Sequence, residues 1–234
     1  MNGTKNWITN GSSSSIHLVI AQTNPELKHK GINVFIVETD WEGVVIGKKE
    51  DKMGIRGSDT TSIMYNNVKV PKENRIGSDG FGFTFAMNTL NGGRIGIAAQ
   101  ALGIAQGAFE LAAQYAQERE TFGKPIVQHQ GVAFKLADMA TDIQAARLLI
   151  YRAAWMKDQH LDFTMASSMA KYFAAEIAMK HTTKAVQIHG GYGYVAEYHV
   201  ERMMRDAKIT QIYEGTSEIQ QIVMSRMIEK GILY

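Results

Sequence analysis

One acidic residue has a setting that suits proton transfer. Near the end of the chain, the segment QIYEGTSEIQ (residues 211–220) places Glu214 between a tyrosine and a glycine, directly before a predicted helix. Ser217 and Gln220 have the spacing of a capping box, with the serine as the N-cap. A carboxylate near a helix N-terminus is stabilised by the helix dipole, so Glu214 has a structural interpretation. It also has a chemical one, a general base held on a glycine-containing turn that faces an apolar pocket.

Three further segments carry side chains that suit the binding of a large ligand. In KNWIT, Trp7 and Thr9 are two residues apart in a predicted strand, so an aromatic ring and a hydroxyl would share one face. In RETFGKPIVQHQ, Arg119 precedes a turn at Phe122–Gly123 and a helix start, and a guanidinium there can bind phosphate. In QIHGGYGY, two glycines at a helix end let a bulky ligand approach the backbone. Each segment also has a structural alternative, respectively a core tryptophan with a turn threonine, a solvated loop, and a glycine helix cap.

The elements that must position these residues fall into two unlike parts of the chain. The first part is rich in β-branched and aromatic residues, which predict strands at 16–22, 32–38 and 61–70 after an early strand that ends at KNWIT. Turn-forming sequences such as NGSSSS and TNPE separate these strands. The segment IGSDGFGF, which begins at residue 76, is a hinge-like junction after which strand signals nearly vanish. We therefore predict one domain over residues 1–77 and a second over 78–234.

The second part consists of Ala-rich segments whose apolar residues are three or four positions apart, a spacing typical of helices. Four long helices are predicted over residues 81–230, with a short helix near 195–205. Pro125 lies near the start of the second long helix, where its fixed φ is favourable. Gly190–Gly191 and Gly231 are expected to end the third and fourth. Because small residues allow close packing, we expect an antiparallel four-helix bundle and an α+β fold class.

Composition excludes several classes of function. The chain has 234 residues and a net charge of +2, which favours neither nucleic acid nor an anionic membrane surface. It has no cysteine, so disulfides, thiolate nucleophiles and Cys-ligated zinc are excluded. There is no P-loop, no Rossmann GxGxxG motif and no HExxH, so neither nucleotide binding of those types nor a metal site is expected. No apolar run is long enough for a membrane span and no signal peptide is visible, so we expect a soluble protein inside a cell or organelle.

Six segments together carry a specific resemblance. They are GTKNWITNG, KMGIRGSDT, GGRIGIAAQALGIAQ, RETFGKPIVQHQ, QIHGGYGY and QIYEGTSEIQ, in this order. The chain resembles the acyl-CoA dehydrogenase family, and most closely its short-chain, butyryl-CoA type members. The resemblance implies α,β-dehydrogenation of a short-chain acyl-CoA to a trans-2-enoyl-CoA, with FAD as cofactor, in fatty-acid or amino-acid catabolism. It assigns the base that removes the α-proton to Glu214. Some members carry the base just before the arginine of LNGGRIG, but here that position is Gly93.

The resemblance also implies roles for other residues. The residues implied to contact FAD are Trp7, Ile8, Thr9, Arg119, Thr121, Phe122, His129, Gln130, Gln187, Ile188, Gly190, Gly191, Thr216, Ser217 and Glu218. Those implied to contact the substrate are Asn91, Gly92, Gly93, Arg94 and Gly215. Asn91 is often an aspartate in similar chains. In the family, the segment around Arg119 reaches the FAD of a neighbouring subunit.

The implied partners are the acyl-CoA substrate, an electron-transfer flavoprotein as electron acceptor, and further copies of the chain in a homotetramer. The implied location is the cytoplasm of a bacterium or the mitochondrial matrix of a eukaryote. Family members carry an N-terminal helical domain and the first half of the β-domain before GTKNWIT, so we expect residues 1–77 to be a partial middle β-domain. Without the FAD-pyrophosphate loop of that portion, the chain alone is expected to purify nearly colourless and inactive. The alternative function is a truncated, non-catalytic remnant that acts only as an oligomerising helical bundle.

Overall fold

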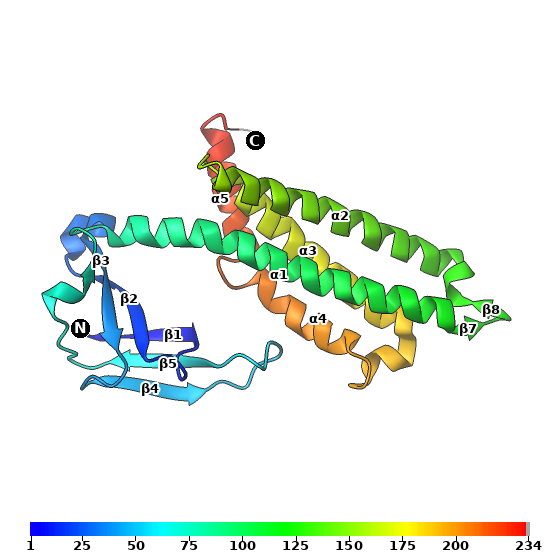
Figure 1. Cartoon of the computed structure of the whole chain (residues 1–234), viewed down its shortest axis with the longest axis horizontal. Helices are drawn as coiled ribbons and strands as arrows, with labels where there is room; N and C mark the ends of the chain where they lie inside the picture. Colours follow the sequence, from blue (N-terminus) through cyan, green and yellow to red (C-terminus); the bar gives the residue numbers. More distant parts are fainter. Residues whose placement is uncertain (233–234) are drawn as a thin grey trace. The chain divides into compact units, whose positions relative to one another are not determined.

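The chain forms two compact units, one over Met1–Thr89 and one from Leu90 onward. These are the units of the computed structural model, which describes residues 1–232 (Figure 1). The first unit consists mainly of strands and the second mainly of helices, which confirms the predicted α+β fold class. The division into domains at residues 77 and 78 stays our proposal for the domain organisation.

The first unit contains two small antiparallel sheets of three strands each. One sheet has the order β1-β5-β4, with β1 at Gly3–Thr9, β5 at Thr60–Tyr65 and β4 at Val44–Lys49. The other has the order β2-β3-β6, with β2 at Ile16–Gln22, β3 at Ile32–Glu38 and β6 at Arg75–Ile76. Their shared core is made of Val19, Val37, Ile63, Tyr65 and Val68. Alternating β-branched residues therefore bury one face, as expected for strands of this kind.

Two of the predicted strands occur with the predicted bounds, and two details differ. β2 and β3 cover 16–22 and 32–38, but β5 ends at Tyr65 because Asn67 turns the chain with a φ of 54°. β1 contains a bulge between Lys5 and Ile8, and Trp7 has a φ of 61°. A bulge interrupts the alternation of side chains, so the prediction that Trp7 and Thr9 share one face of a regular strand was wrong. The alternative of a core tryptophan is also wrong, since Trp7 is 73% exposed.

The second unit is built on long helices that run side by side in Figure 1. These are α1 (Gly82–Glu118, whose first residues belong to the first unit), α2 (Gln130–Asp158) and α3 (Thr164–His189), followed by α4 (Val200–Lys208) and α5 (Ser217–Glu229). A hairpin of β7 (Glu120–Thr121) and β8 (Lys124–Pro125) joins α1 to α2. Short connections make consecutive helices antiparallel, so the predicted helical bundle is present with all four long helices and the short one.

Alanine allows the close packing of this bundle. Ala98, Ala101 and Ala105 of α1 are fully buried against α2 and α3 residues such as Ile143 and Ala170. Part of α1 is long and apolar enough to cross a membrane by length and composition. Because its alanines are buried in the core of the bundle, we interpret α1 as a core helix, and the absence of a membrane span stays a prediction.

The helix ends confirm some of the predicted signals and correct others. Gly190, with a φ of 61°, ends α3, and Gly231, with a φ of 78°, follows α5. The prediction that Ser217 is the N-cap of α5 was wrong. Thr216 is the N-cap, and its hydroxyl accepts a hydrogen bond from the Ile219 amide. α2 begins at Gln130 and not beside Pro125, which precedes a separate 3-10 turn at Ile126–Gln128.

Candidate functional site

Glu214 lies on a turn with an uncommon backbone conformation. Its φ is +53° and that of Gly215 is +91°, so two consecutive residues are left-handed. A non-glycine residue in this region costs roughly 1–2 kcal/mol, and such strain is found mostly where the surrounding structure holds it in place. Gly215 has a second reason to be glycine, since a Cβ there would lie 2.7 Å from the Gln220 amide nitrogen. The turn is therefore held by contacts with its neighbours.

Side chains from α3 and α5 supply those contacts. Lys171 Nζ donates to the Gly215 carbonyl at 2.6 Å, and Gln220 Nε2 donates to the same carbonyl at 3.0 Å. Ser217 Oγ donates to Glu176 Oε1 at 2.6 Å, which explains why its hydroxyl does not cap the helix. The residues that follow Glu214 are therefore fixed by a buried hydrogen-bond network.

The Glu214 carboxylate lies beside α1. A Cβ built on Gly93 would be 2.8 Å from Glu214 Oε2, closer than a carbon atom can normally approach. The absence of a side chain at residue 93 thus leaves the space that the carboxylate occupies. Gly93 and Glu214 are therefore neighbours in space, although they are 121 positions apart in the sequence. Gly93 is the position at which some relatives carry the base.

Arg94 brings a buried positive charge to the same site. Its Nη1 donates to Asn91 Oδ1 at 2.9 Å and to Ser168 Oγ at 3.2 Å. Burial lowers the pKa of Arg94, and the charge of Glu214 opposes that shift. Arg94 Nε is buried without a hydrogen-bond partner among the residues that the structure describes. A buried donor without a partner is costly, so this atom is a candidate for contact with a bound ligand.

Tyr213, the residue before Glu214, is also half-buried. Its hydroxyl donates to Gln100 Oε1 of α1. Burial raises the pKa of Tyr213, so its hydroxyl stays protonated at neutral pH. The side chain anchors the turn to α1, in addition to the α3 contacts.

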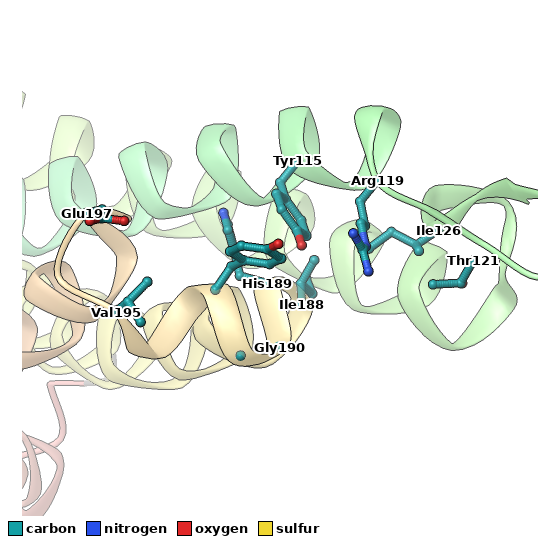
Figure 2. Close-up of a pocket in the computed structure, with 11 residues that line it drawn as sticks. Tyr115, Arg119, Thr121, Ile126, Ile188, His189, Gly190, Val195 and Glu197 are labelled. Carbon is teal, nitrogen blue, oxygen red and sulfur yellow. The ribbon is translucent and has the colours of Figure 1, made fainter.

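A separate cavity of about 600 Å³ lies between the end of α1 and the end of α3 (Figure 2). Figure 2 shows Arg119 toward one end and Glu197 toward the other, with Tyr115 and His189 between them. The rings of Tyr115 and His189 stack at 4.4 Å, and the Arg119 guanidinium lies 5.8 Å from the Tyr192 ring. The lining consists of Tyr115, Arg119, Thr121, Ile126, Ile188, His189, Gly190, Gly191, Tyr192, Val195 and Glu197. Its volume is in the range of small-molecule sites.

The chemistry of this cavity fits part of a dinucleotide such as FAD. Arg119 has no ion pair within the part of the chain that the structure describes, and a free guanidinium matches a phosphate. A Cβ on Gly190 or Gly191 would meet nothing within 4 Å, so the backbone there is open to a ligand. Aromatic faces at Tyr115 and Tyr192 suit a planar ring. Burial lowers the pKa of His189, so its imidazole is neutral at pH 7 and offers an uncharged aromatic face.

The structure brings together some of the residues predicted to bind FAD. Arg119, Thr121, Ile188, Gly190 and Gly191 all line the cavity. His129 lies next to it and its Nε2 is 3.2 Å from the Thr121 hydroxyl. The roles of these residues stay predictions, but their proximity is a finding of the structure.

Other predicted residues lie apart from the cavity lining. Phe122 is 96% exposed at the hairpin turn, with a φ of 52°, and Gln130 and Gln187 are exposed on helices. Trp7, Ile8 and Thr9 belong to the first unit, on β1. Thr216, Ser217 and Glu218 begin α5, beside the Glu214 turn. In the substrate set, Gly92 lies near Lys157 Nζ, which a Cβ on Gly92 would approach to 3.6 Å.

Sequence reasoning missed several residues of both sites. Lys171, Ser168 and Glu176 contact the Glu214 turn or Arg94, yet they lie in an Ala-rich helix without a recognisable motif. Tyr115 and His189 stack across two helices that are distant in the sequence. A lysine in the middle of an alanine-rich, buried helical face was the one available signal for Lys171.

Two matches to known families cover most of the chain. Residues 1–68 match the family described as "Acyl-CoA dehydrogenase, middle domain", and residues 80–229 match "Acyl-CoA dehydrogenase, C-terminal domain". Among curated proteins, the chain is similar to the "Acyl-CoA dehydrogenase, short-chain specific" of Clostridium acetobutylicum, with 52% identity over 97% of this chain and 60% of that protein. It is also similar to the "Caffeyl-CoA reductase-Etf complex subunit CarC" of Acetobacterium woodii, with 49% identity over 98% of this chain and 61% of that protein.

One of the similar solved structures belongs to a protein that is also longer than this chain. The butyryl-CoA dehydrogenase of Megasphaera elsdenii matches with a TM-score of 0.95 and 51% identity, over 97% of this chain and 60% of that chain. The chain thus spans about three fifths of the length of the relatives that it matches.

Proposed function

The chain belongs to the acyl-CoA dehydrogenase family, and we propose that it is an FAD-dependent short-chain acyl-CoA dehydrogenase or the C-terminal part of one. The proposed reaction removes the α-proton and the β-hydride of a short-chain acyl-CoA and yields a trans-2-enoyl-CoA. Whole-protein activity, substrate and partners are proposals, because the chain covers only part of its relatives.

One observation carries the assignment of Glu214 as the base. Its carboxylate occupies the space above Gly93, on a left-handed turn that α3 and α5 hold by hydrogen bonds. A base acts efficiently when it is held in one orientation, because positioning lowers the entropic part of the barrier. We propose that Glu214 accepts the α-proton. The developing negative charge on the thioester carbonyl would be stabilised by the Glu214 backbone N–H, a type of donor worth roughly 3–4 kcal/mol.

Residues of α1 are the proposed contacts for the substrate on the CoA side. Asn91, Gly92, Gly93 and Arg94 form one turn of this helix, and Gly215 follows Glu214, whose carboxylate lies against Gly93. The unpaired Arg94 Nε supports this proposal, since a bound ligand would give it an acceptor.

The proposed FAD contacts in the helical unit are the cavity residues Arg119, Thr121, Ile188, Gly190 and Gly191, with Phe122, His129, Gln130 and Gln187 around them. At the start of α5 they are Thr216, Ser217 and Glu218, and in the first unit Trp7, Ile8 and Thr9. Arg119 would hold a phosphate and the two glycines would admit the ligand to the backbone. When bound, FAD supplies the acceptor for the hydride of the β-carbon.

We also propose partners by family resemblance. An electron-transfer flavoprotein would reoxidise the enzyme, and a relative from Acetobacterium woodii is named as a subunit of an Etf complex. Assembly with further copies into a homotetramer, and a location in a bacterial cytoplasm or mitochondrial matrix, stay predictions.

The test supplies in trans the N-terminal portion of a relative that this chain does not match, and compares the purified protein with its Glu214→Gln variant in that mixture. With butyryl-CoA in deuterium oxide, the protein should exchange the α-protons of the thioester, as measured by mass spectrometry, and the variant should not. The variant should bind butyryl-CoA with unchanged affinity by calorimetry, because only the proton acceptor is lost. Glu229→Gln, at the end of the helix α5 that follows the Glu214 turn, is the matched control and should exchange normally.

Flavin absorbance after incubation with FAD separates an enzyme from a non-catalytic remnant. A protein that takes up neither FAD nor butyryl-CoA would contradict the proposed function. Normal α-proton exchange in Glu214→Gln would show that another residue is the base.

A further inference from the structure

Lys171 is the largest side chain that is fully buried among the described residues. It lies in the first half of α3, between Ala170 and Ala174 of the bundle core. Lysine is almost never fully buried unless it has a partner, because removal of an ammonium group from water is costly. A neutral apolar side chain would fill this position at lower cost, so the charge needs a reason.

The partner of Lys171 is the turn that carries Glu214. Its Nζ donates to the Gly215 carbonyl at 2.6 Å, a short, charge-assisted hydrogen bond. Gln220, which is also fully buried, donates to the Gly215 carbonyl at 3.0 Å and to the Glu214 carbonyl at 3.4 Å. Two buried donors thus converge on the two peptide groups that follow the base.

The charges that face Lys171 come from four elements. They are Glu176 of α3, Arg94 of α1, Glu214 of the turn and Glu218 of α5. Burial lowers the pKa of Lys171 to about 8, while the three carboxylates oppose the shift and Arg94 adds to it. The ammonium form therefore predominates at pH 7. Glu214 itself is faced by Arg94, Lys171 and the hydroxyl of Tyr213.

We propose that Lys171 is a positioning residue for Glu214. Its ammonium group holds the Glu214–Gly215 segment in the left-handed conformation that places the carboxylate beside Gly93. The inference rests on the proposed role of Glu214 as the base. Lys171 does not contact the reacting atoms, so its effect is transmitted through the turn.

The experiment measures the rate of α-proton exchange of butyryl-CoA in deuterium oxide, together with the affinity for butyryl-CoA, with the N-terminal portion of a relative supplied in trans. Lys171→Met keeps the length and the apolar stem but removes the donor and the charge. We expect its exchange rate at pH 7 to fall about 100-fold, the effect of displacing a catalytic group by about 1 Å, with unchanged affinity.

The matched control is Lys180→Met, the same substitution on the same helix at a half-exposed lysine that pairs with Asp142. It should change neither the rate nor the affinity for butyryl-CoA. A purely structural role for Lys171 would lower the affinity together with the rate in Lys171→Met, whereas a positioning role lowers the rate alone.

A rescue experiment is possible because the chain contains no other cysteine. Lys171→Cys can be alkylated in the unfolded state with 2-bromoethylamine, which restores an ammonium group, or with 1-bromopropane, which adds a neutral chain of similar size. We expect the exchange rate to recover only in the aminoethylated protein. This pair keeps the test valid if Lys171→Met fails to fold.

The outcomes separate the two proposals. Absence of α-proton exchange in the unmodified protein, with the N-terminal portion of a relative supplied in trans, contradicts the proposed function. Exchange in the unmodified protein with an equal rate in Lys171→Met, or in the propylated protein, overturns the inference about Lys171 alone.

Discussion

Substitution of Gly93 by alanine is expected to stabilise the protein and to slow its chemistry at the same time. Gly93 lies inside α1, where glycine costs about 1 kcal/mol relative to alanine. The added methyl group would meet Glu214 Oε2 at 2.8 Å, whereas ordinary contacts begin near 3.4 Å. The atom that must yield is the end of a flexible side chain, so we expect the carboxylate to move and the helix to stay intact.

The size of both effects follows from the structure. A gain of about 1 kcal/mol should raise the melting temperature by roughly 3 °C for a unit of this size. The carboxylate must shift by about 0.6 Å, the difference between the two contact distances. Since a displacement of about 1 Å can cost about 100-fold, we expect the α-proton exchange of butyryl-CoA to slow by about tenfold.

Thermal unfolding followed by circular dichroism and exchange followed by mass spectrometry measure the two quantities separately. Gly96→Ala is the matched control, because Gly96 lies one turn further along α1 and a Cβ there would meet nothing within 4 Å. It should stabilise the protein similarly without loss of exchange. An unchanged exchange rate in Gly93→Ala would refute the placement of the carboxylate, and a loss in both variants would show that α1 itself tolerates no alanine.

Three other outcomes are expected. Arg119→Ala should lower FAD retention and loosen oligomers, measured by flavin absorbance and sedimentation, because it removes a phosphate partner; full flavin content with full assembly would make Arg119 an ordinary loop residue. Thr216→Ala should destabilise the protein by about 1 kcal/mol in urea unfolding, since Thr216 caps α5, and an unchanged stability would contradict this cap. Burial lowers the pKa of His181, although the charge of Asp142 opposes this shift. The unfolded state therefore binds a proton more readily than the folded state. The free energy of unfolding should thus be highest above about pH 6.5 and should decline as the pH falls below that value. The decline should be shallower in His181→Asn, and an equal slope would contradict this account.

Local sequence was sufficient for most of the fold. β2, β3 and the ends of α3 and α5 follow from β-branched segments and from glycines with positive φ, which act within a few residues. It was insufficient at β1, where a bulge at Trp7 breaks the alternation, and at α5, where two adjacent hydroxyl residues could each be the cap. In both cases the choice depends on a partner elsewhere, β5 for the bulge and Glu176 for Ser217.

The residues of the candidate site could likewise be predicted from the sequence only in part. The sequence by itself identified Glu214, Gly93 and Arg119, because their types and motif spacing are visible along the chain. Only the tertiary structure decided that Gly93 leaves the space for the Glu214 carboxylate and that Lys171 donates to the residue after it. The physical reason is that these contacts join residues tens of positions apart through the packing of α1 and α3 against the α5 turn. Helix periodicity indicates which face of each helix is apolar, but not which side chain of one helix meets which residue of another.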